Sequence, residues 1–449
     1  MPLSLFGTDG VRGRPGLPPL DEPTLLRLGA AVVQTCGKKK GNVRVLIGQD
    51  TRESGAWIVR HLARGIEGES GRVVDGGILP TPAVAFLTKQ GGFDAGLVVS
   101  ASHNPFQDNG VKVFTHEGMK ADDDLEACLT EIVSDQEFVC SEAPLSTREA
   151  SQSIDAYIEH TKRVFDGVSL PSNLRLAIDC ANGATSRIAP AVFGGLGLDP
   201  VVICNEPNGR NINLRCGSTN PDRLARTVLD KGCCLGAAFD GDGDRVVFVD
   251  HQGQLVNGDA ILLVAARRLA AMGNLKEKAI VATVMSNIAL EQILHADGMS
   301  VHWCGVGDRT VWAEMRQRGI VLGGEQSGHI ILGDHLPTGD GLATALLIIR
   351  AIVETGSDLC ALAADFVPVP QVLVNVKVRR RVPLAELPEV SRLIADAERY
   401  LAKTGRVIVR YSGTEPLLRI MIEGSNREEI HRLARTVADG VRVEIGADL

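Results

Sequence analysis

Short apolar runs rich in valine and isoleucine recur along this chain, and their recurrence is what most limits its fold. Each run ends in a polar loop that contains glycine, and a segment of helical length usually precedes the next run. Such alternation predicts α/β units built on strands that are buried and mainly parallel. The expected strands cover residues 43–47, 95–99, 111–114, 174–178, 201–204, 235–239, 246–249, 279–284, 301–304 and 320–322.

The texture of the sequence changes after about residue 367. A Pro-Val-Pro segment is followed by strand-like residues 372–378, a charged helical pattern, and two more strand-like runs at 407–409 and 418–422. This order is typical of a smaller α+β domain. Although 449 residues would make roughly three average domains, four blocks fit the pattern better. The expected domains are three similar mixed α/β domains, 1–150, 151–255 and 256–367, and a smaller C-terminal α+β domain, 368–449.

Composition excludes several classes of function. A net charge of −8 and 4% aromatic residues argue against a broad surface for nucleic acid, which needs positive charge and often stacking rings. Gly7 and Asp9 interrupt the start of the chain, and no apolar stretch reaches ~18 residues, so neither a signal peptide nor a membrane span is expected. The ten cysteines lack paired spacing, which favours reduced thiols in a cytoplasm. The lysines at 38–40 are expected to form a solvated loop.

The first loop with candidate catalytic residues is Ser-Ala-Ser-His-Asn-Pro at residues 100–105, directly after strand 95–99. The end of such a strand lies at the rim of the sheet, where α/β proteins place reactive groups. Ser102 is therefore a candidate nucleophile. The alternative is a serine that only forms the turn or caps a helix. The adjacent His103 adds little on its own, and the G-x-S-x-G motif is absent.

The second loop, Asp-Gly-Asp-Gly-Asp-Arg at 240–245, lies between two strand-like runs. The carboxylates of Asp240, Asp242 and Asp244 alternate with glycines, so they can turn toward one hard cation, and Mg²⁺ is the expected guest. An EF-hand is excluded, because its required glycine and glutamate positions hold Arg245 and His251. The alternative is a solvated acidic turn, which the flanking apolar strands disfavour.

Two further loops offer groups for binding. Residues 323–329 present Glu325 and Ser327, which suit sugar hydroxyls or an amine, although an ordinary loop is an equal alternative. Residues 410–416 combine guanidinium, hydroxyl and glycine backbone groups and resemble an anion nest, with a polar hairpin as the alternative. The anion-binding candidates are Arg410, Ser412, Gly413, Thr414 and Arg419. No Walker motif or complete G-x-G-x-x-G supports nucleotide binding.

These four loops, in this order, together with Gly-Thr-Asp-Gly-Val-Arg-Gly at 7–13, resemble the α-D-phosphohexomutase superfamily over the whole chain. The resemblance implies four domains around a central cleft, each contributing one loop. It implies that Ser102 carries a phosphoryl group and that the three aspartates bind Mg²⁺ together with an oxygen of that phosphoserine. By the same comparison, Glu325 and Ser327 meet the sugar, and the loop from Arg410 to Thr414, with Arg419, holds the phosphate that does not react.

The third loop, with Gln326, and Val-Gly-Asp-Arg at 306–309 are similar to the branch that acts on glucosamine phosphates. That branch implies exchange of phosphate between O6 and O1 through a 1,6-bisphosphate, feeding UDP-N-acetylglucosamine and cell-wall precursor synthesis. The alternatives are a mutase for mannose or glucose phosphates and a metal-dependent phosphatase with Asp240 as its nucleophile. A non-catalytic sensor would not need Ser102. Tyr411 departs from the branch, where lysine is frequent.

Charge balance points to further residues. A phosphoserine of about −2 and three aspartates against one Mg²⁺ leave about −3 before a substrate binds, so cations are required nearby. The candidates are Arg12, Lys112 and Arg245, and by resemblance Lys112 or His103 is the group that handles the proton. The expected partner is a small sugar phosphate, without nucleic acid or membrane, and the chain is compatible with a homodimer.

Overall fold

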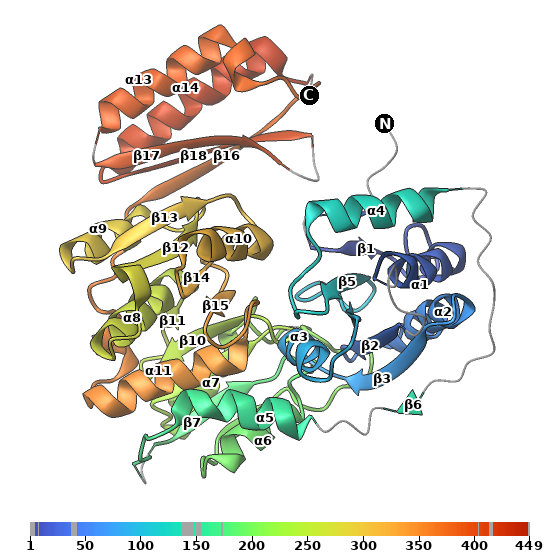
Figure 1. Cartoon of the computed structure of the whole chain (residues 1–449). Coiled ribbons are helices and arrows are strands. Elements are labelled where there is room, and N and C mark those ends of the chain that lie inside the picture. Colours follow the sequence, from blue (N-terminus) through green and yellow to red (C-terminus); the bar gives the residue numbers. More distant parts are fainter. Residues whose placement is uncertain are drawn as a thin grey trace. The chain divides into compact units, whose positions relative to one another are not determined.

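The computed structural model describes residues 5–7, 9–36, 43–135, 148–149, 154–171, 174–402, 404–412 and 416–447. The lysines at 38–40, Gly413 and Thr414 lie outside these ranges. The chain divides into two compact units (Figure 1). The first joins Met1–Thr283 to His302–Ala364, and the second joins Val284–Val301 to Asp365–Leu449.

The first sheet is six-stranded, in the order β1-β5-β4-β2-β3-β6. Its strands are β1 (Val11–Gly13), β2 (Arg44–Gln49), β3 (Arg72–Ile78), β4 (Ala95–Val99), β5 (Asn109–Thr115) and β6 (Arg148–Glu149). Strand β2 is parallel to β3 and β4, whereas β5 is antiparallel to β4 and β1. Because β2 and β4 run the same way, the residues that follow Gln49 and Val99 emerge at the same edge of the sheet.

Four helices accompany this sheet: α1 (Glu22–Cys36), α2 (Gly55–Gly68), α3 (Thr81–Gln90) and α4 (Asp123–Ser134). Alternate residues of β2, Val45 and Ile47, join one apolar core with residues of α1, α2 and α4, as the two-residue period of a strand requires. Helix α4 begins after Asp122, whose side chain accepts a hydrogen bond from the backbone N–H of Leu125.

The second sheet has the order β11-β10-β9-β7-β8. Its strands are β7 (Leu176–Asp179), β8 (Val201–Ile203), β9 (Leu235–Phe239), β10 (Val246–Asp250) and β11 (Leu255–Val256). Strand β7 is parallel to β8 and β9, whereas β9 and β10 form an antiparallel hairpin. The neighbouring helical segments are α5 (Asp155–Lys162), η1 (Arg163–Phe165), α6 (Ile188–Gly195) and α7 (Asp222–Lys231).

The third sheet has the order β13-β12-β14-β15, with β12 parallel to β14 and β14 antiparallel to β15. Its strands are β12 (Ala279–Thr283), β13 (Ser300–Cys304), β14 (Leu322–Gly324) and β15 (Ile330–Leu332). The helical segments of this region are α8 (Gly258–Ala271), η2 (Lys276–Lys278), α9 (Ile288–Ala296), α10 (Asp308–Arg318), α11 (Gly341–Thr355) and α12 (Leu359–Ala363). Helix α11 is capped by Asp340 and is buried along most of its length.

The C-terminal sheet is antiparallel, in the order β16-β18-β17. It consists of β16 (Gln371–Lys377), β17 (Gly405–Tyr411) and β18 (Leu417–Gly424), with η3 (Leu384–Glu386), α13 (Pro388–Leu401) and α14 (Arg427–Ile445). Buried residues of α13, α14 and the sheet form one apolar core. Asn426 caps α14 by accepting hydrogen bonds from two backbone N–H groups of its first turn.

These sheets confirm the predicted fold class of three mixed α/β domains and a C-terminal α+β domain. None of the helices in the described part of the chain is both long and apolar enough to cross a bilayer. The nine described cysteines are all free thiols.

Candidate active site

Ser102 lies just beyond the end of β4, at the edge shared with β2. Its side chain is almost fully buried, and its backbone adopts a left-handed conformation with φ of 51°. The Ser102 hydroxyl donates a hydrogen bond to Asp240 Oδ2 at 2.5 Å and lies 3.3 Å from His103 Nδ1. A left-handed non-glycine residue at a strand end costs energy and is often found at functional sites. The sequence-predicted nucleophile and the predicted metal loop therefore meet.

The aspartate loop is the turn of the β9–β10 hairpin. Asp240, Asp242 and Asp244 are all buried, and each offers a ligand atom within 4.8 Å of the others. The intervening glycines allow the three carboxylates to lie this close together. A Cβ at Gly241 would lie 2.5 Å from the Ser102 carbonyl oxygen, and Gly243 has a φ of 73°. Only glycine at 241 lets the aspartate loop approach the serine loop this closely.

Lys112 supplies a positive charge in the middle of this cluster. It lies on β5, and its buried ammonium group is 2.9 Å from Asp242, 3.2 Å from Asp244 and 3.2 Å from Asp9. Burial alone would lower the pKa of Lys112, but the carboxylates raise it well above its ordinary value. Lys112 is therefore held as a cation.

The pKa values of Asp240 and Asp244 are shifted in opposite directions. Burial, followed by repulsion from Asp244 and Asp242, raises the pKa of Asp240 well above its ordinary value. Burial also opposes ionisation of Asp244, but Lys112 and His329 outweigh it and lower the pKa of Asp244 well below the ordinary value. The cluster therefore holds more negative charge than its side-chain cations neutralise easily.

The donor set fits a hard divalent cation. Asp242 Oδ1 and Asp244 Oδ1 are buried and have no hydrogen-bond partner among the described residues. The other Asp242 oxygen accepts a hydrogen bond from Thr81 Oγ1 at 2.5 Å, which fixes the orientation of that carboxylate. Buried oxygens without partners are costly, and a group of carboxylate oxygens is what Mg²⁺ binds in proteins.

His103 lies beside Ser102, and Arg245 lies beside His103. Arg245 NH1 lies 3.2 Å from His103 Nδ1, and the Arg245 backbone N–H donates to Asp240. Burial, with the neighbouring Arg245 and Arg12 charges, lowers the pKa of His103 to about 4. His103 is therefore neutral at neutral pH. Arg12 donates to the Ala101 carbonyl at 3.3 Å and forms an ion pair with Asp9.

A chain of charges extends the site beyond the predicted residues. Lys120 bridges Asp9 and Asp308, and His329 lies 3.5 Å from Asp308 and 3.7 Å from Asp244. The backbone nitrogen of Gly339 lies 3.1 Å from His329 Nε2. Burial alone would lower the pKa of His329, but the Asp244 and Asp308 carboxylates raise it. This network connects the N-terminal segment to the third loop.

The third loop is a tight turn beside the aspartate hairpin. The Gly328 N–H donates to the Glu325 carbonyl, and the Val246 N–H at the start of β10 donates to the Gly328 carbonyl at 3.1 Å. The Glu325 carboxylate accepts from the Gly307 N–H, whereas Ser327 is exposed. Both predicted sugar-binding residues thus lie on the loop next to the aspartates.

The predicted phosphate loop belongs to the second compact unit. Arg410 and Arg419 are register partners on β17 and β18. Burial and the Arg419 charge lower the pKa of Arg410. Like charges directly opposite each other are unfavourable unless an anion joins them. Gly413 and Thr414 of this loop lie outside the described residues.

Two neighbours of the phosphate loop were not part of the prediction. Arg381 donates to the Ser412 carbonyl at 2.6 Å, which adds a third guanidinium beside the loop. The Tyr411 hydroxyl donates to the Val382 carbonyl at 2.6 Å and accepts from the Val382 N–H. Tyr411 therefore uses its polar atom to fix the backbone at Val382.

The sequence did not predict several residues that contribute to the site. Asp50, Arg52, Thr81 and Lys120 have no chemical motif of their own, yet each contacts the serine loop, the aspartates or their charge network. A signal existed for Asp50 and Arg52, which directly follow a predicted strand whose end lies beside that of 95–99. Thr81 and Lys120 are brought in only by tertiary packing.

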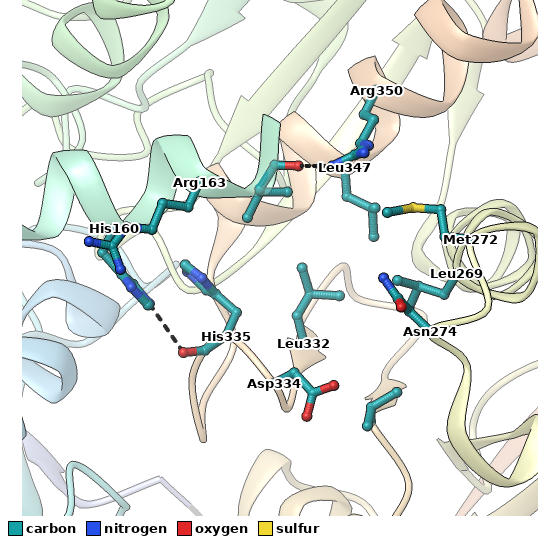
Figure 2. A pocket seen from close by; sticks show the side chains of 12 residues that line it. His160, Arg163, Leu269, Met272, Asn274, Leu332, Asp334, His335, Leu347 and Arg350 are labelled. Carbon is teal, nitrogen blue, oxygen red and sulfur yellow. Dashed lines mark hydrogen bonds between the residues drawn. The ribbon is translucent and has the colours of Figure 1, made fainter. Parts of the chain in front are cut away.

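Two other features include none of the predicted site residues. Asp179, Cys204 and Cys216 are buried within 4.8 Å of one another, but the Asp179 carboxylate accepts hydrogen bonds from the backbone N–H groups of Ala181 and Gly217. The Asp179 carboxylate thus fixes the backbone of the two loops that contain Ala181 and Gly217. A cavity of about 410 Å³ is lined by residues such as His160, His335 and Arg350 and by none of the predicted site residues (Figure 2).

Comparison with known proteins accounts for nearly the whole chain. Four domain descriptions of phosphoglucomutase/phosphomannomutase match it in order: alpha/beta/alpha domain I at residues 3–139, domain II at 155–253, domain III at 257–369 and the C-terminal domain at 373–440.

One similar relative is the phosphoglucosamine mutase of Solibacter usitatus, 44% identical over 449 residues, which cover 99% of this chain and all of that protein. Among solved structures, a phosphoglucomutase/phosphomannomutase family protein from Burkholderia thailandensis has a TM-score of 0.81 at 24% identity, covering 99% of both chains. The N-acetylphosphoglucosamine mutase of Aspergillus fumigatus, solved with GlcNAc-6P and magnesium, has a TM-score of 0.63 at 20% identity, covering 98% of this chain and 95% of that one. These structures support the fold.

Proposed function

The chain belongs to the phosphoglucomutase/phosphomannomutase family, in its phosphoglucosamine mutase branch, and from this premise we propose that Ser102 carries the phosphoryl group with which this isomerase interconverts glucosamine 6-phosphate and glucosamine 1-phosphate. One observation carries the assignment: the Ser102 hydroxyl lies 2.5 Å from Asp240, at the edge of the aspartate cluster. Among the described residues of the four predicted loops, no other hydroxyl forms a hydrogen bond with Asp240, Asp242 or Asp244.

The chemistry requires a phosphoryl group stored on the protein. O6 and O1 are far apart on the sugar, and phosphoryl transfer needs donor and acceptor oxygens in line. Phospho-Ser102 gives its phosphoryl group to the free sugar hydroxyl, the Ser102 Oγ–P bond breaks, and a 1,6-bisphosphate forms. After the bisphosphate turns over, Ser102 Oγ accepts the other phosphoryl group and the product leaves.

The positions of His103 and Lys112 suggest separate roles. The acceptor hydroxyl must lose a proton as its oxygen bonds to phosphorus. His103 is neutral and its Nδ1 is 3.3 Å from Ser102 Oγ, so it suits that proton, whereas Lys112 is held as a cation by three carboxylates. Lys112, Arg245 and Arg12 then balance the negative charge of phosphate and aspartates.

The proposed metal is Mg²⁺, held by Asp240, Asp242, Asp244 and an oxygen of phospho-Ser102. When bound, it supplies positive charge next to the phosphoryl oxygens and so favours transfer. The buried, unpartnered carboxylate oxygens support this choice, as does the magnesium in the Aspergillus fumigatus enzyme.

The substrate contacts and cellular setting complete the proposal. Glu325 and Ser327 bind the sugar, and the remaining phosphate binds Arg410, Ser412, Gly413, Thr414 and Arg419. We propose domain boundaries at 1–150, 151–255, 256–367 and 368–449. The product feeds amino-sugar and cell-wall precursor synthesis in the cytoplasm.

The Ser102→Ala variant tests the phosphoserine. We expect it to fold like the unaltered protein, to lack the phosphoryl mass on the peptide containing residue 102, and to lose mutase activity completely. Ser134→Ala, at the exposed end of α4, is the matched control and should keep both the phosphoryl group and the mutase activity. Normal turnover by Ser102→Ala would refute the proposal. A phosphoryl group on Asp240 would be released by hydroxylamine, and that result would favour the phosphatase alternative.

A comparison of substrates tests the branch. We expect the largest kcat/KM for glucosamine 1-phosphate when glucosamine, glucose and mannose 1-phosphates are compared on the phosphorylated, Mg²⁺-loaded protein. A preference for mannose 1-phosphate would instead indicate a phosphomannomutase.

A further inference from the structure

The backbone of the serine loop is held by one buried arginine. Arg52 NH2 donates to the Ser102 carbonyl at 2.9 Å and to the Asn104 carbonyl at 2.8 Å, while NH1 donates to the carbonyls of Asp108, at 3.0 Å, and Pro105. The planar guanidinium thus satisfies four carbonyls of one loop. A lysine has no comparable fixed array of donors.

A second set of contacts connects Arg52 to the amide of Ser102. Arg52 Nε is 2.8 Å from Asp50 Oδ2, and the same oxygen accepts the Ser100 hydroxyl at 2.5 Å. Ser100 Oγ in turn accepts the Ser102 N–H at 2.9 Å. Both the N–H and the C=O of Ser102 are therefore tied, directly or through two side chains, to Arg52.

Asn213 holds the same two carbonyls from a different part of the chain. It lies in the loop between β8 and α7, and its side-chain Nδ2 donates to Ser102 O at 2.8 Å and to Asn104 O at 3.1 Å. Asn213 has a φ of 58°, a left-handed conformation that asparagine tolerates better than most residues. The Ser102 and Asn104 carbonyls are thus each shared by two donors.

We propose that Arg52 and Asn213 are positioning residues, a clamp that holds the left-handed backbone of Ser102 so that its Oγ stays fixed while the sugar bisphosphate turns over. The inference rests on the proposed phosphoserine function. Ser102 must serve two acceptor oxygens in succession, so its position has to survive the exchange of one sugar end for the other. The side chains of Arg52 and Asn213, from separate α/β regions, hold the Ser102 backbone in one position.

The test compares two clamp variants with two controls. Arg52→Lys keeps the charge and removes the array of donors, and Asn213→Ala removes only the second donor to each carbonyl. The controls are Arg60→Lys and Asn211→Ala, because Arg60 is exposed on α2 and the Asn211 side chain bonds within its own loop. For each variant, kcat is expressed per chain that carries phosphoserine, measured by intact mass, and KM is measured for glucosamine 1-phosphate.

We expect kcat to fall about 100-fold in Arg52→Lys, the scale of a misplaced reacting group, and about tenfold in Asn213→Ala, the scale of one hydrogen bond. KM should stay unchanged in both, because the clamp touches no substrate. Amides of the serine loop should exchange hydrogen faster in Asn213→Ala. The controls should match the unaltered protein.

The outcomes distinguish failure of the clamp proposal from failure of the proposed function. If Arg52→Lys does not fold, Asn213→Ala decides the question alone. Unchanged kcat in Asn213→Ala, or an equal loss in Asn211→Ala, would overturn the clamp while leaving phosphoserine intact. Absence of phosphoserine and of turnover in the unaltered protein would instead overturn the proposed function.

Discussion

At the scale of single residues, burial decides which charges matter. Lys112 and the aspartates around it are withdrawn from water, so their charges must be balanced by partners inside the protein. The positions of Ser102 and the aspartate loop, directly after the apolar strands that end at Val99 and Phe239, could be predicted from the sequence because this spacing is local information. Thr81 and Lys120 could not be assigned in this way, since their partners lie far away in the chain.

Replacement of Lys112 tests this dependence. Lys112→Met leaves Asp242 and Asp244 without their buried cation, so we expect a loss of about 3 kcal/mol in the free energy of unfolding, measured by urea denaturation with EDTA present. Mutase activity should fall at least about 100-fold. Lys89→Met, at an exposed position on α3, is the control. Unaltered stability of Lys112→Met would show that the carboxylates do not need this charge.

At the scale of helices and strands, prediction succeeded where apolar runs are continuous and failed where they are broken. The strands at 95–99 and 235–239 have the predicted bounds, and the run at 320–322 is displaced to β14 because Gly323 and Gly324 pair with β15. Strand β3 contains Asp75, Gly76 and Gly77 and so gives no apolar signal. Its position is fixed by pairing with β2, which local sequence does not report.

A stack of rings connects three elements and makes stability depend on pH. His160 of α5 lies between Phe86 of α3, at 4.4 Å, and His335 in the loop before α11, at 4.2 Å between ring centroids. His160 Nε2 is 3.2 Å from the His335 carbonyl (Figure 2). Burial, followed by the His335 charge, lowers the pKa of His160. Asp340 raises this pKa, whereas Arg163 lowers it.

The sign of the pH effect follows from that shift. The unfolded chain binds a proton at His160 near pH ~6.5, whereas the folded protein resists it, so this residue's contribution to stability is present above ~6.5 and is lost as pH falls. In His160→Phe, which retains stacking, the decrease in unfolding free energy between about pH 7.5 and about pH 5.5 should be smaller. His295→Gln, at an exposed position, should behave like the unaltered protein. An unchanged decrease in His160→Phe would contradict the assignment.

At the scale of the whole molecule, the second compact unit is discontinuous in sequence. The Asn287 side chain donates to the Val369 carbonyl and accepts from the Val369 N–H, both at 3.0 Å, and it also caps α9. Arg406 donates to the Ser286 carbonyl at 2.6 Å. The sequence indicated a smaller C-terminal domain, but inclusion of 284–301 depends on contacts across 82 residues, beyond the reach of local patterns.

Asn287→Ala tests that connection. Loss of the cap and of both bonds to Val369 should cost about 2 kcal/mol, seen as earlier urea unfolding and faster proteolysis within 284–301. Asn375→Ala, on the exposed side of β16, is the control. Equal proteolysis of the two variants would contradict the prediction.

The split course of the second unit also has a consequence during translation. Residues 284–301 leave the ribosome well before Val369 and Arg406 are synthesised. This segment interrupts the first unit in the sequence, so that unit begins to fold while the segment still lacks its partners. A ribosome-stalled chain ending near Ala364 should therefore expose this segment to chaperones, and completion of the C-terminal sheet should withdraw it.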